Sequence, residues 1–264
     1  MNEPLSPPVQ AGRVVFIGAG PGDPDLLTVK AARLLGQADL VLYAGSLVSP
    51  EVVALARPDA RVADSSGLTL AETHTLLAAT VASGGLAARV HTGDPALYGA
   101  VAEQANLLAA AGIDFEIVPG VTTASAAAAA FKVSFTVPEA TQTLILTRLA
   151  GRTPMPPGEA LADLARHQAA LAVYLSAGDP EGVRTALLTG GYPAHTPIAV
   201  AHRLGWPGER CFWATLADLP ERVRQAQADR QTIFLVLPGL GRDSASRLYD
   251  PSFGHGFRPA RGDA

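Results

Sequence analysis

The sequence contains a single cysteine, Cys211, among its 264 residues. One cysteine excludes an internal disulfide and fits a reducing compartment. No segment approaches the roughly 18 consecutive apolar residues that a membrane span needs. Residues 1–12 also lack the basic start and apolar stretch of a signal peptide. We therefore expect a cytoplasmic protein with no membrane partner.

An excess of basic charge is also absent. The chain has 20 Lys and Arg against 24 Asp and Glu, and a formal net charge of -4. Nucleic-acid-binding proteins usually carry a basic face, whereas the basic residues here are scattered, so no nucleic-acid partner is expected. The six histidines show no zinc-motif spacing, and one cysteine adds no ligand set, so no metal site is expected either.

What the chain does have is an alternation of short apolar strands and helical patterns. Such strands are buried on both faces, which is typical of a parallel sheet in an α/β domain. In the first half the predicted strands are 14–17, 39–43, 87–92 and 115–118, and the predicted helices are 25–35, 70–82, 99–111 and 121–131.

A second alternating series follows a proposed domain boundary near Pro138. Its predicted strands are 143–147, 171–175, 197–202, 211–215 and 232–237, and its predicted helices are 159–168, 181–188 and 219–228. We therefore divide the chain into α/β domains at 1–137 and 138–240. Residues 241–264 are polar and rich in Gly, Arg and Pro, and are expected to form an extended tail that is ordered only if it docks.

The stretch GAGPGDPD, residues 18–25, joins the first strand to the first helix. It resembles a dinucleotide-binding loop only weakly, because the third glycine of that pattern would fall at Asp23. Pro21 and Pro24 also remove N–H donors that a phosphate would need. The simplest interpretation is a tight strand-to-helix turn in which Asp25 caps the helix.

Two further glycine turns follow predicted strands. HTGDPALYG, residues 91–99, contains a Gly-Asp-Pro turn, and VPGVTTASAAAAA, residues 118–130, contains a Pro-Gly turn before small residues. The carboxyl ends of parallel strands meet at one edge of a sheet, so the three turns are expected to converge there.

These motifs, in this order, resemble the tetrapyrrole methylases, the S-adenosylmethionine-dependent enzymes of cobalamin and sirohaem synthesis. The resemblance covers about Val14 to Pro238 and includes VYLSAG, PIAVAHRLGWPGER and TLADL in the second half. Within the family, YAGSLV, TRLAGRTPMP and RLYDPSFGHGFRP are similar to the branch that methylates C11 of precorrin-4. Ala44 stands where other branches typically have an acidic residue.

The resemblance implies two α/β domains of the class III methyltransferase type, with the active site in the trough between them, and a homodimer. It also implies S-adenosylmethionine as cofactor and a tetrapyrrole as substrate. The cofactor positions that match the family are Pro21, Thr92, Gly93, Asp94, Leu97, Thr122, Thr123, Leu175, Leu204 and Thr232. The candidate substrate positions are Tyr43, Ser46, Tyr98, Arg148 and Arg152, because a substrate with many carboxylates should meet arginines.

Several alternatives stay open at this point. Asp94 could simply cap the helix that follows it, and Arg148 could form an ion pair at the rim. No general base is assigned, because methylation of C11 makes that carbon quaternary and leaves no proton to remove from it. A cobalt-containing substrate, a non-catalytic tetrapyrrole-binding protein and, more remotely, a nucleotide-dependent oxidoreductase remain the rival functions.

Overall fold

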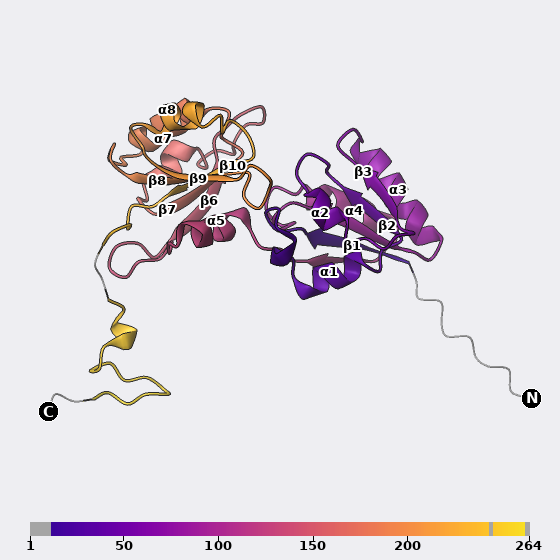
Figure 1. Ribbon diagram of the computed structural model, residues 1–264, viewed down its shortest axis with the longest axis horizontal. Helices are drawn as coiled ribbons and strands as arrows, with labels where there is room; N and C mark the ends of the chain where they lie inside the picture. The colour runs from indigo at the N-terminus through magenta and orange to yellow at the C-terminus, as the bar shows by residue number, and fades with distance from the viewer. Residues whose placement is uncertain (1–11, 243–244, 262–264) are drawn as a thin grey trace, which may run out of the picture. The chain divides into compact units, whose positions relative to one another are not determined.

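The computed structural model describes residues 12–242 and 245–261, which fall into two compact units. The first unit holds the residues up to Ala126 together with Arg203–Glu209, and the second holds Ala127–His202 and the residues from Arg210 onward. Each unit is built on one five-stranded sheet (Figure 1). The division falls inside helix α5 (Thr123–Phe131), whereas the sequence placed the domain boundary near Pro138.

The first unit alternates strands and helices. Its strands are β1 (Arg13–Gly18), β2 (Leu40–Tyr43), β3 (Arg61–Asp64), β4 (Leu86–His91) and β5 (Phe115–Val118). Its helices are η1 (Pro24–Leu26), α1 (Val29–Leu35), α2 (Pro50–Val53), α3 (Leu70–Ala82) and α4 (Val101–Ala110). The sheet is fully parallel, as predicted, with strand order β3-β2-β4-β1-β5.

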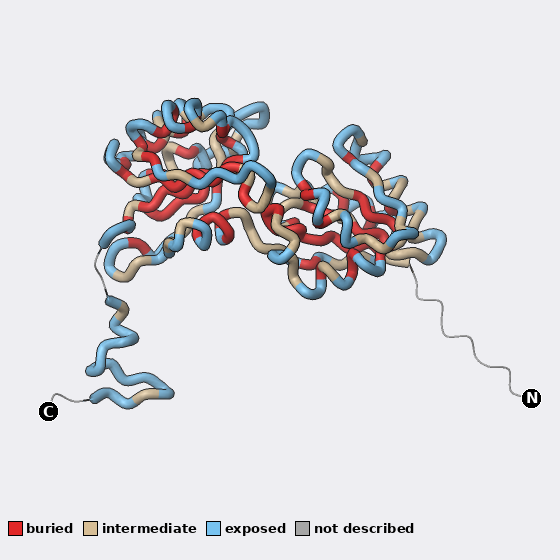
Figure 2. The backbone as a smooth tube through the Cα atoms, viewed as in Figure 1, coloured by how far each residue is buried: buried red, intermediate tan, exposed pale blue. Residues whose placement is uncertain are grey.

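Both faces of this sheet are buried, and β1 is apolar from Val14 to Ile17. Val15 and Ile17 pack into one hydrophobic cluster with α1, and Val14 and Phe16 pack into another with Leu77 and Leu108 of α3 and α4. Figure 2 shows the buried backbone concentrated in the strands of each unit. The short elements β3 and α2 were missed in the sequence, since β3 is a largely exposed edge strand without an apolar run.

The predicted helix 25–35 is in fact two elements, and its predicted cap is wrong. The carboxylate of Asp23, not Asp25, accepts the backbone N–H of Asp25 over 2.9 Å and caps the 3-10 turn η1. The α-helix starts only after Thr28, whose hydroxyl accepts the N–H of Ala31. Pro24 at the first position of η1 favours this separate short turn.

The second unit carries a mixed sheet. Its strands are β6 (Leu144–Arg148), β7 (Ala170–Tyr174), β8 (Pro197–His202), β9 (Arg210–Thr215) and β10 (Thr232–Val236), and its further helices are α6 (Leu161–Ala165), α7 (Pro180–Thr189) and α8 (Leu219–Gln225). The strand order is β6-β7-β10-β8-β9. Only β6 and β7 are parallel, and β10 and β9 run antiparallel to their neighbours.

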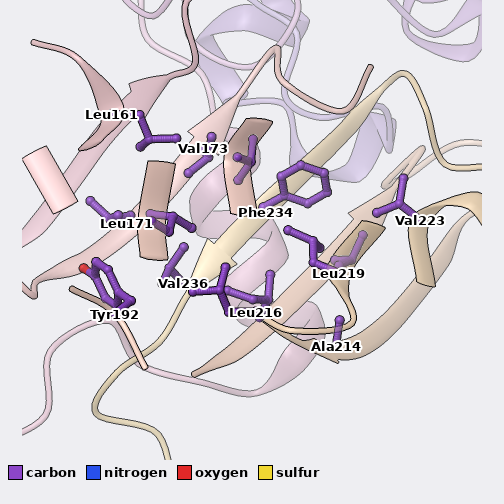
Figure 3. Close-up of a cluster of buried hydrophobic side chains, with 14 of the residues drawn as sticks. Leu161, Leu171, Val173, Tyr192, Ala214, Leu216, Leu219, Val223, Phe234 and Val236 are labelled. Carbon is purple, nitrogen blue, oxygen red and sulfur yellow. The ribbon is translucent and has the colours of Figure 1, made fainter. Parts of the chain in front are cut away.

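One face of this sheet carries the core shown in Figure 3, in which Leu171, Val173, Phe234 and Val236 pack with residues of α6 and α8. The hydroxyl of Tyr192 donates to the carbonyl oxygen of Ala169, which satisfies its one polar atom inside the core. Burial raises the pKa of Tyr192, so it stays neutral.

The described part of the predicted tail forms a local loop. Arg258 organises it, because its Nη2 atom donates to the carbonyl oxygens of Leu248 and Asp250, each over 2.7 Å. The 3-10 turn η2 (Arg247–Tyr249) lies within it. Residues 1–11, 243–244 and 262–264 lie outside the described residues. Within the described ranges, no helix combines the length and the apolar character needed to cross a membrane.

Candidate functional site

The three glycine turns meet at the carboxyl edge of the first sheet, as their positions after strands predicted. They follow β4, β1 and β5, which are neighbours in the sheet. A reciprocal pair of backbone hydrogen bonds joins the first two turns. Gly20 N–H donates to Gly93 O over 3.2 Å, and Gly93 N–H donates to Gly20 O over 2.7 Å. The conformation of each turn therefore depends on the other.

The third turn is packed against the first two through glycine. A methyl group on Gly120 would overlap the carbonyl oxygen of Gly93 and lie 2.8 Å from the Cα atom of Gly18. No side chain fits where three backbones approach this closely. The space beside Gly18 is likewise occupied by the backbone of Gly93 and Gly120.

Asp94 bridges the second and third turns. Its Oδ1 atom accepts the N–H of Ala96 over 2.8 Å, and its Oδ2 atom accepts the N–H of Gly120 over 3.0 Å. The first bond lies within the turn and does not cap α4, whose N-cap residue is Ala100 and which receives no side-chain cap bond, so the capping alternative is wrong. The second bond is a long-range tie. One carboxylate thus fixes the Thr92–Gly93–Asp94 turn relative to the loop that leads into α5.

The segment after Asp94 has a strained backbone. Tyr98 and Ala100 have φ values of 57° and 49°, in the left-handed region that costs a non-glycine residue free energy. The N–H of Leu97 donates to the carbonyl of Asp94 over 3.1 Å and closes the turn. Strain of this kind concentrates where a structure holds groups ready for a ligand. The candidate contacts Leu97 and Tyr98 therefore lie on a fixed turn.

Thr122 and Thr123 begin helix α5. The Thr122 hydroxyl accepts the N–H of Ser125 over 3.2 Å and lies 3.0 Å from the Ser125 hydroxyl, so it caps the helix. The Thr123 hydroxyl lies beside Gly93, since a methyl group there would be 3.6 Å from it. Thr123 therefore adjoins the second turn, and Thr122 precedes Thr123 in the chain.

The loop after β2 carries Tyr43 and Ser46. Asp64, at the end of β3, holds it: its Oδ1 atom accepts the N–H of Gly45 and that of Ser66, each over 2.8 Å. These backbone hydrogen bonds, that from Ser66 foremost, lower the pKa of Asp64, so the carboxylate stays charged. The backbone of the Tyr43–Ser46 loop is thus fixed at the same sheet edge as the turns.

A partly buried arginine, which no sequence motif marked, lies beneath this edge. Arg89 on β4 donates from Nε to the Gln104 side chain over 2.9 Å and from Nη1 to the Ser65 hydroxyl over 2.9 Å and the Leu42 carbonyl over 3.3 Å. Burial lowers its pKa to about 10, and it remains charged at neutral pH. It ties the ends of β2 and β3 to helix α4. In the sequence, this arginine is recognisable only as a single charged residue within an apolar strand.

His91, two residues along the same strand, is buried and neutral. Burial, and secondarily the charge of Arg89, lower its pKa to about 3. The His91 ring packs against the Phe16 ring, with their centroids 5.8 Å apart. His91 supports the start of the second turn, since its backbone carbonyl oxygen accepts the N–H of Ala19 over 2.7 Å.

His91 makes stability depend on pH. The unfolded chain binds a proton at this residue below the ordinary histidine pKa of 6.5, whereas the native state stays neutral down to about pH 3. Below pH 6.5, this group should therefore lower the free energy of unfolding by about 1.4 kcal/mol for each unit that the pH falls; above 6.5 it should have no effect. In urea unfolding, the His91→Gln variant should lack this part of the pH dependence. The exposed His167→Gln should retain it, and equal slopes in both variants would contradict the assignment.

Pro21 and Leu204 also belong to the first unit. Pro21 is buried, and its carbonyl oxygen accepts the indole N–H of Trp206 over 3.0 Å. Leu204 is buried as well and precedes Gly205 in the Arg203–Glu209 segment. The first glycine turn and this segment, far apart in sequence, thus lie side by side.

The candidate cofactor contacts of the second unit are Leu175 and Thr232. Leu175 directly follows β7, is 70 % exposed and has a φ of 54°, a strained and open position. Thr232 is buried, and its hydroxyl donates to the carbonyl of Ala228 or Arg230 and lies 2.9 Å from Nδ1 of His202. The Thr232 side chain is therefore occupied within its own unit.

The two candidate substrate arginines differ in their contacts. Arg148 donates from Nη1 to the carbonyls of Leu149 and Thr153, and from Nη2 to that of Pro154 over 2.9 Å. It therefore shapes its own loop, and no ion pair of Arg148 is found in the described residues. Arg152, in that loop, is exposed and makes no ion pair there either.

The Gly-Asp-Pro motif at residues 178–180 has a structural role. Asp179 caps α7 by accepting the N–H of Gly182 over 2.8 Å. No group of three or more His, Cys, Asp or Glu side chains suited to a metal ion occurs in the part of the chain described.

Comparison with known proteins gives a consistent family. The family model described as Tetrapyrrole (Corrin/Porphyrin) Methylases matches residues 13–220. The chain is 45 % identical to the precorrin-4 C(11)-methyltransferase of Pseudomonas aeruginosa, over 93 % of this chain and 98 % of that protein.

Solved structures agree. The X-ray structure of cobalt precorrin-4 methyltransferase, a cobalamin biosynthetic enzyme, matches with a TM-score of 0.85 and 44 % identity, over 88 % of this chain and 98 % of that one. The uroporphyrin-III C-methyltransferase of Thermus thermophilus, complexed with S-adenosylhomocysteine, matches with a TM-score of 0.71 and 30 % identity, over 85 % of this chain and 96 % of that one.

Proposed function

The chain belongs to the tetrapyrrole (corrin/porphyrin) methylases, and we propose on this basis that it transfers a methyl group to C11 of precorrin-4, giving precorrin-5 in cobalamin biosynthesis. The observation that carries the proposal is the nearly full-length similarity to a precorrin-4 C(11)-methyltransferase. A second candidate substrate is cobalt-precorrin-4, since the cobalt precorrin-4 methyltransferase structure is almost equally similar. The metal would then be part of the substrate.

The cofactor of the family is S-adenosylmethionine, and a related structure was solved with its product S-adenosylhomocysteine. In the first unit, the residues that would hold it are Pro21, Thr92, Gly93, Asp94, Leu97, Thr122, Thr123 and Leu204; Leu175 and Thr232 would contribute from the second. The linked glycine turns support this assignment, because a folded cofactor needs backbone hydrogen bonds and a few fixed polar partners. Thr232 would contribute backbone or methyl contacts, since its hydroxyl is already engaged.

Methyl transfer requires mainly that the cofactor and the substrate are correctly positioned. S-adenosylmethionine supplies a methyl group that is already activated, and an electron-rich tetrapyrrole carbon attacks it. The chain's contribution is to fix the two reactants in line and to keep water away. Because C11 becomes quaternary, no base is needed at that carbon. The strained Tyr98 turn and the Asp64-held loop with Tyr43 and Ser46 would support one face of the substrate.

Arg152 is the sharper candidate for a substrate carboxylate, because Arg148 already donates to three carbonyls. Arg152→Ala should raise KM for the tetrapyrrole roughly tenfold, the range of a hydrogen bond to a charged group, and leave S-adenosylhomocysteine affinity unchanged. Steady-state kinetics with calorimetry measures both. Arg166→Ala, an exposed arginine of the same unit, is the control. An unchanged KM for Arg152→Ala would remove this residue from the site.

The rival functions are separable by binding and turnover. The methylase proposal expects calorimetric binding of S-adenosylhomocysteine and none of NAD, and NAD binding alone would favour an oxidoreductase. Turnover with metal-free and cobalt-containing precorrin-4 then identifies the substrate form. Binding of the macrocycle without any methyl transfer would indicate a carrier. We also propose a cytoplasmic homodimer, which light scattering tests as twice the 27.2 kDa chain mass.

A further inference from the structure

The Arg203–Glu209 segment, which joins β8 to β9, is a rigid loop within the first unit. Trp206 N–H donates to the Arg203 carbonyl over 2.9 Å, and Glu209 N–H donates to the Trp206 carbonyl over 3.0 Å. The Glu209 carboxylate in turn accepts the N–H of Gly205 over 2.7 Å. Three hydrogen bonds within seven residues fix the loop before any ligand binds.

This loop is packed directly against the first glycine turn. A methyl group on Gly22 would lie 2.6 Å from Nε1 of Trp206, and one on Gly205 would lie 2.5 Å from the backbone N of Asp23. The indole N–H donates to the carbonyl of Pro21 over 3.0 Å. The contact is therefore backbone against indole and backbone against backbone, with a directional bond at its centre.

The first turn is consequently held on two sides. Gly20 is bonded to Gly93 of the second turn, and Pro21 is bonded to Trp206. A turn with glycine at positions 20 and 22 would otherwise sample many conformations, and ordering it on binding would cost affinity. Prior ordering removes that cost from the binding step.

We propose that Trp206 is a positioning residue, which holds the Gly20–Asp23 turn in the conformation that binds S-adenosylmethionine. The inference deepens the proposed function, because it rests on Pro21 and Leu204 lying at the cofactor. Trp206 acts through the turn, by its bond to the Pro21 carbonyl and its contact with Gly22. Its loss therefore weakens cofactor binding more than it weakens the fold.

The chain offers a matched control, since it has only two tryptophans. Trp213 lies in the second unit, 40 % exposed, with its ring 4.9 Å from that of Phe131. Trp206→Phe removes the N–H and keeps a ring, whereas Trp206→Leu removes both. Trp213→Phe leaves Trp206 as the single tryptophan.

The test is calorimetric titration of each variant with S-adenosylhomocysteine, with thermal unfolding of the same samples. We expect affinity to fall roughly fivefold in Trp206→Phe, the worth of one hydrogen bond, and further in Trp206→Leu. Unfolding midpoints should stay close to wild type, and Trp213→Phe should bind like wild type. In Trp213→Phe, S-adenosylhomocysteine should change the Trp206 emission, which a merely structural tryptophan would not report.

The following results would contradict the proposal. Wild-type affinity in Trp206→Leu, or affinity losses of equal size in Trp206→Phe and Trp213→Phe, would overturn the positioning role while leaving the proposed function intact. No binding of S-adenosylhomocysteine by the wild-type protein would overturn both.

Discussion

Replacing Gly120 by alanine should disable the candidate cofactor site. The new methyl group would overlap the Gly93 carbonyl and lie 2.8 Å from the Cα atom of Gly18, so the third turn must move away from the other two. Backbone displacement of this kind costs about 2–3 kcal/mol of stability. Because a displacement near 1 Å can cost about a hundredfold in rate, methyl transfer should fall by about that factor. S-adenosylhomocysteine affinity should fall with it.

Gly67→Ala is the matched control for this substitution. Gly67 lies in the same unit, and a methyl group there meets no atom within 4 Å. Gly67→Ala should have the stability and the methyl-transfer rate of the wild type. Its unfolding midpoint could be slightly higher in denaturant, because alanine restricts the conformations of the unfolded chain. Chemical unfolding and a methyl-transfer assay report both quantities. If Gly120→Ala kept wild-type affinity and rate, the close contact of the three turns would not matter for the site.

Replacing Asp94 by alanine should have the second large effect, a loss of affinity for S-adenosylhomocysteine. The side chain accepts one N–H within its own turn and one from Gly120 in the third turn. Bonds from N–H groups to a carboxylate are the stronger kind, and losing the long-range one frees the turn to move. We expect S-adenosylhomocysteine affinity to fall about tenfold or more, measured by calorimetry. Asp94→Asn, which keeps an acceptor oxygen, should lose less.

The chain supplies its own comparison for Asp94. Asp179 occupies the same Gly-Asp-Pro context, but it only caps α7 through Gly182. Asp179→Ala should lower the free energy of unfolding by about 1 kcal/mol, the worth of a cap, without changing cofactor affinity. The two variants thus separate capping from site formation. Equal, small effects of both substitutions on affinity would restrict Asp94 to a local role in its own turn.

The sequence was sufficient to predict the edge of the first sheet. Apolar runs such as Val14–Ile17 marked the strands, and the rule that parallel strands end on one side brought the turns at Gly20, Gly93 and Gly120 together. What the sequence did not reveal is why the glycines are there. Gly18 and Gly120 pack against backbone that is tens of residues away, and Gly20 and Gly93 are hydrogen-bonded to each other. No local sequence pattern records such contacts.

The polar contacts of individual side chains could not be predicted either. Arg89 looked like one charge in a strand, yet it ties β2, β3 and α4 together. From the sequence, Arg148 could either contact the substrate or form an ion pair. The structure shows that it donates hydrogen bonds to carbonyl oxygens of its own loop. The contact of Trp206 with Pro21 joins positions 185 residues apart. Such partners become evident only when the fold places them side by side.

Locating the transferred methyl group tests the central claim most directly. The protein would be incubated with precorrin-4 and S-adenosylmethionine that carries a ¹³C-labelled methyl group, and the product examined by NMR. We expect one new methyl signal attached to a quaternary C11. A label on another ring carbon, or no transfer to either metal-free or cobalt-containing precorrin-4 while S-adenosylhomocysteine binds, would contradict it.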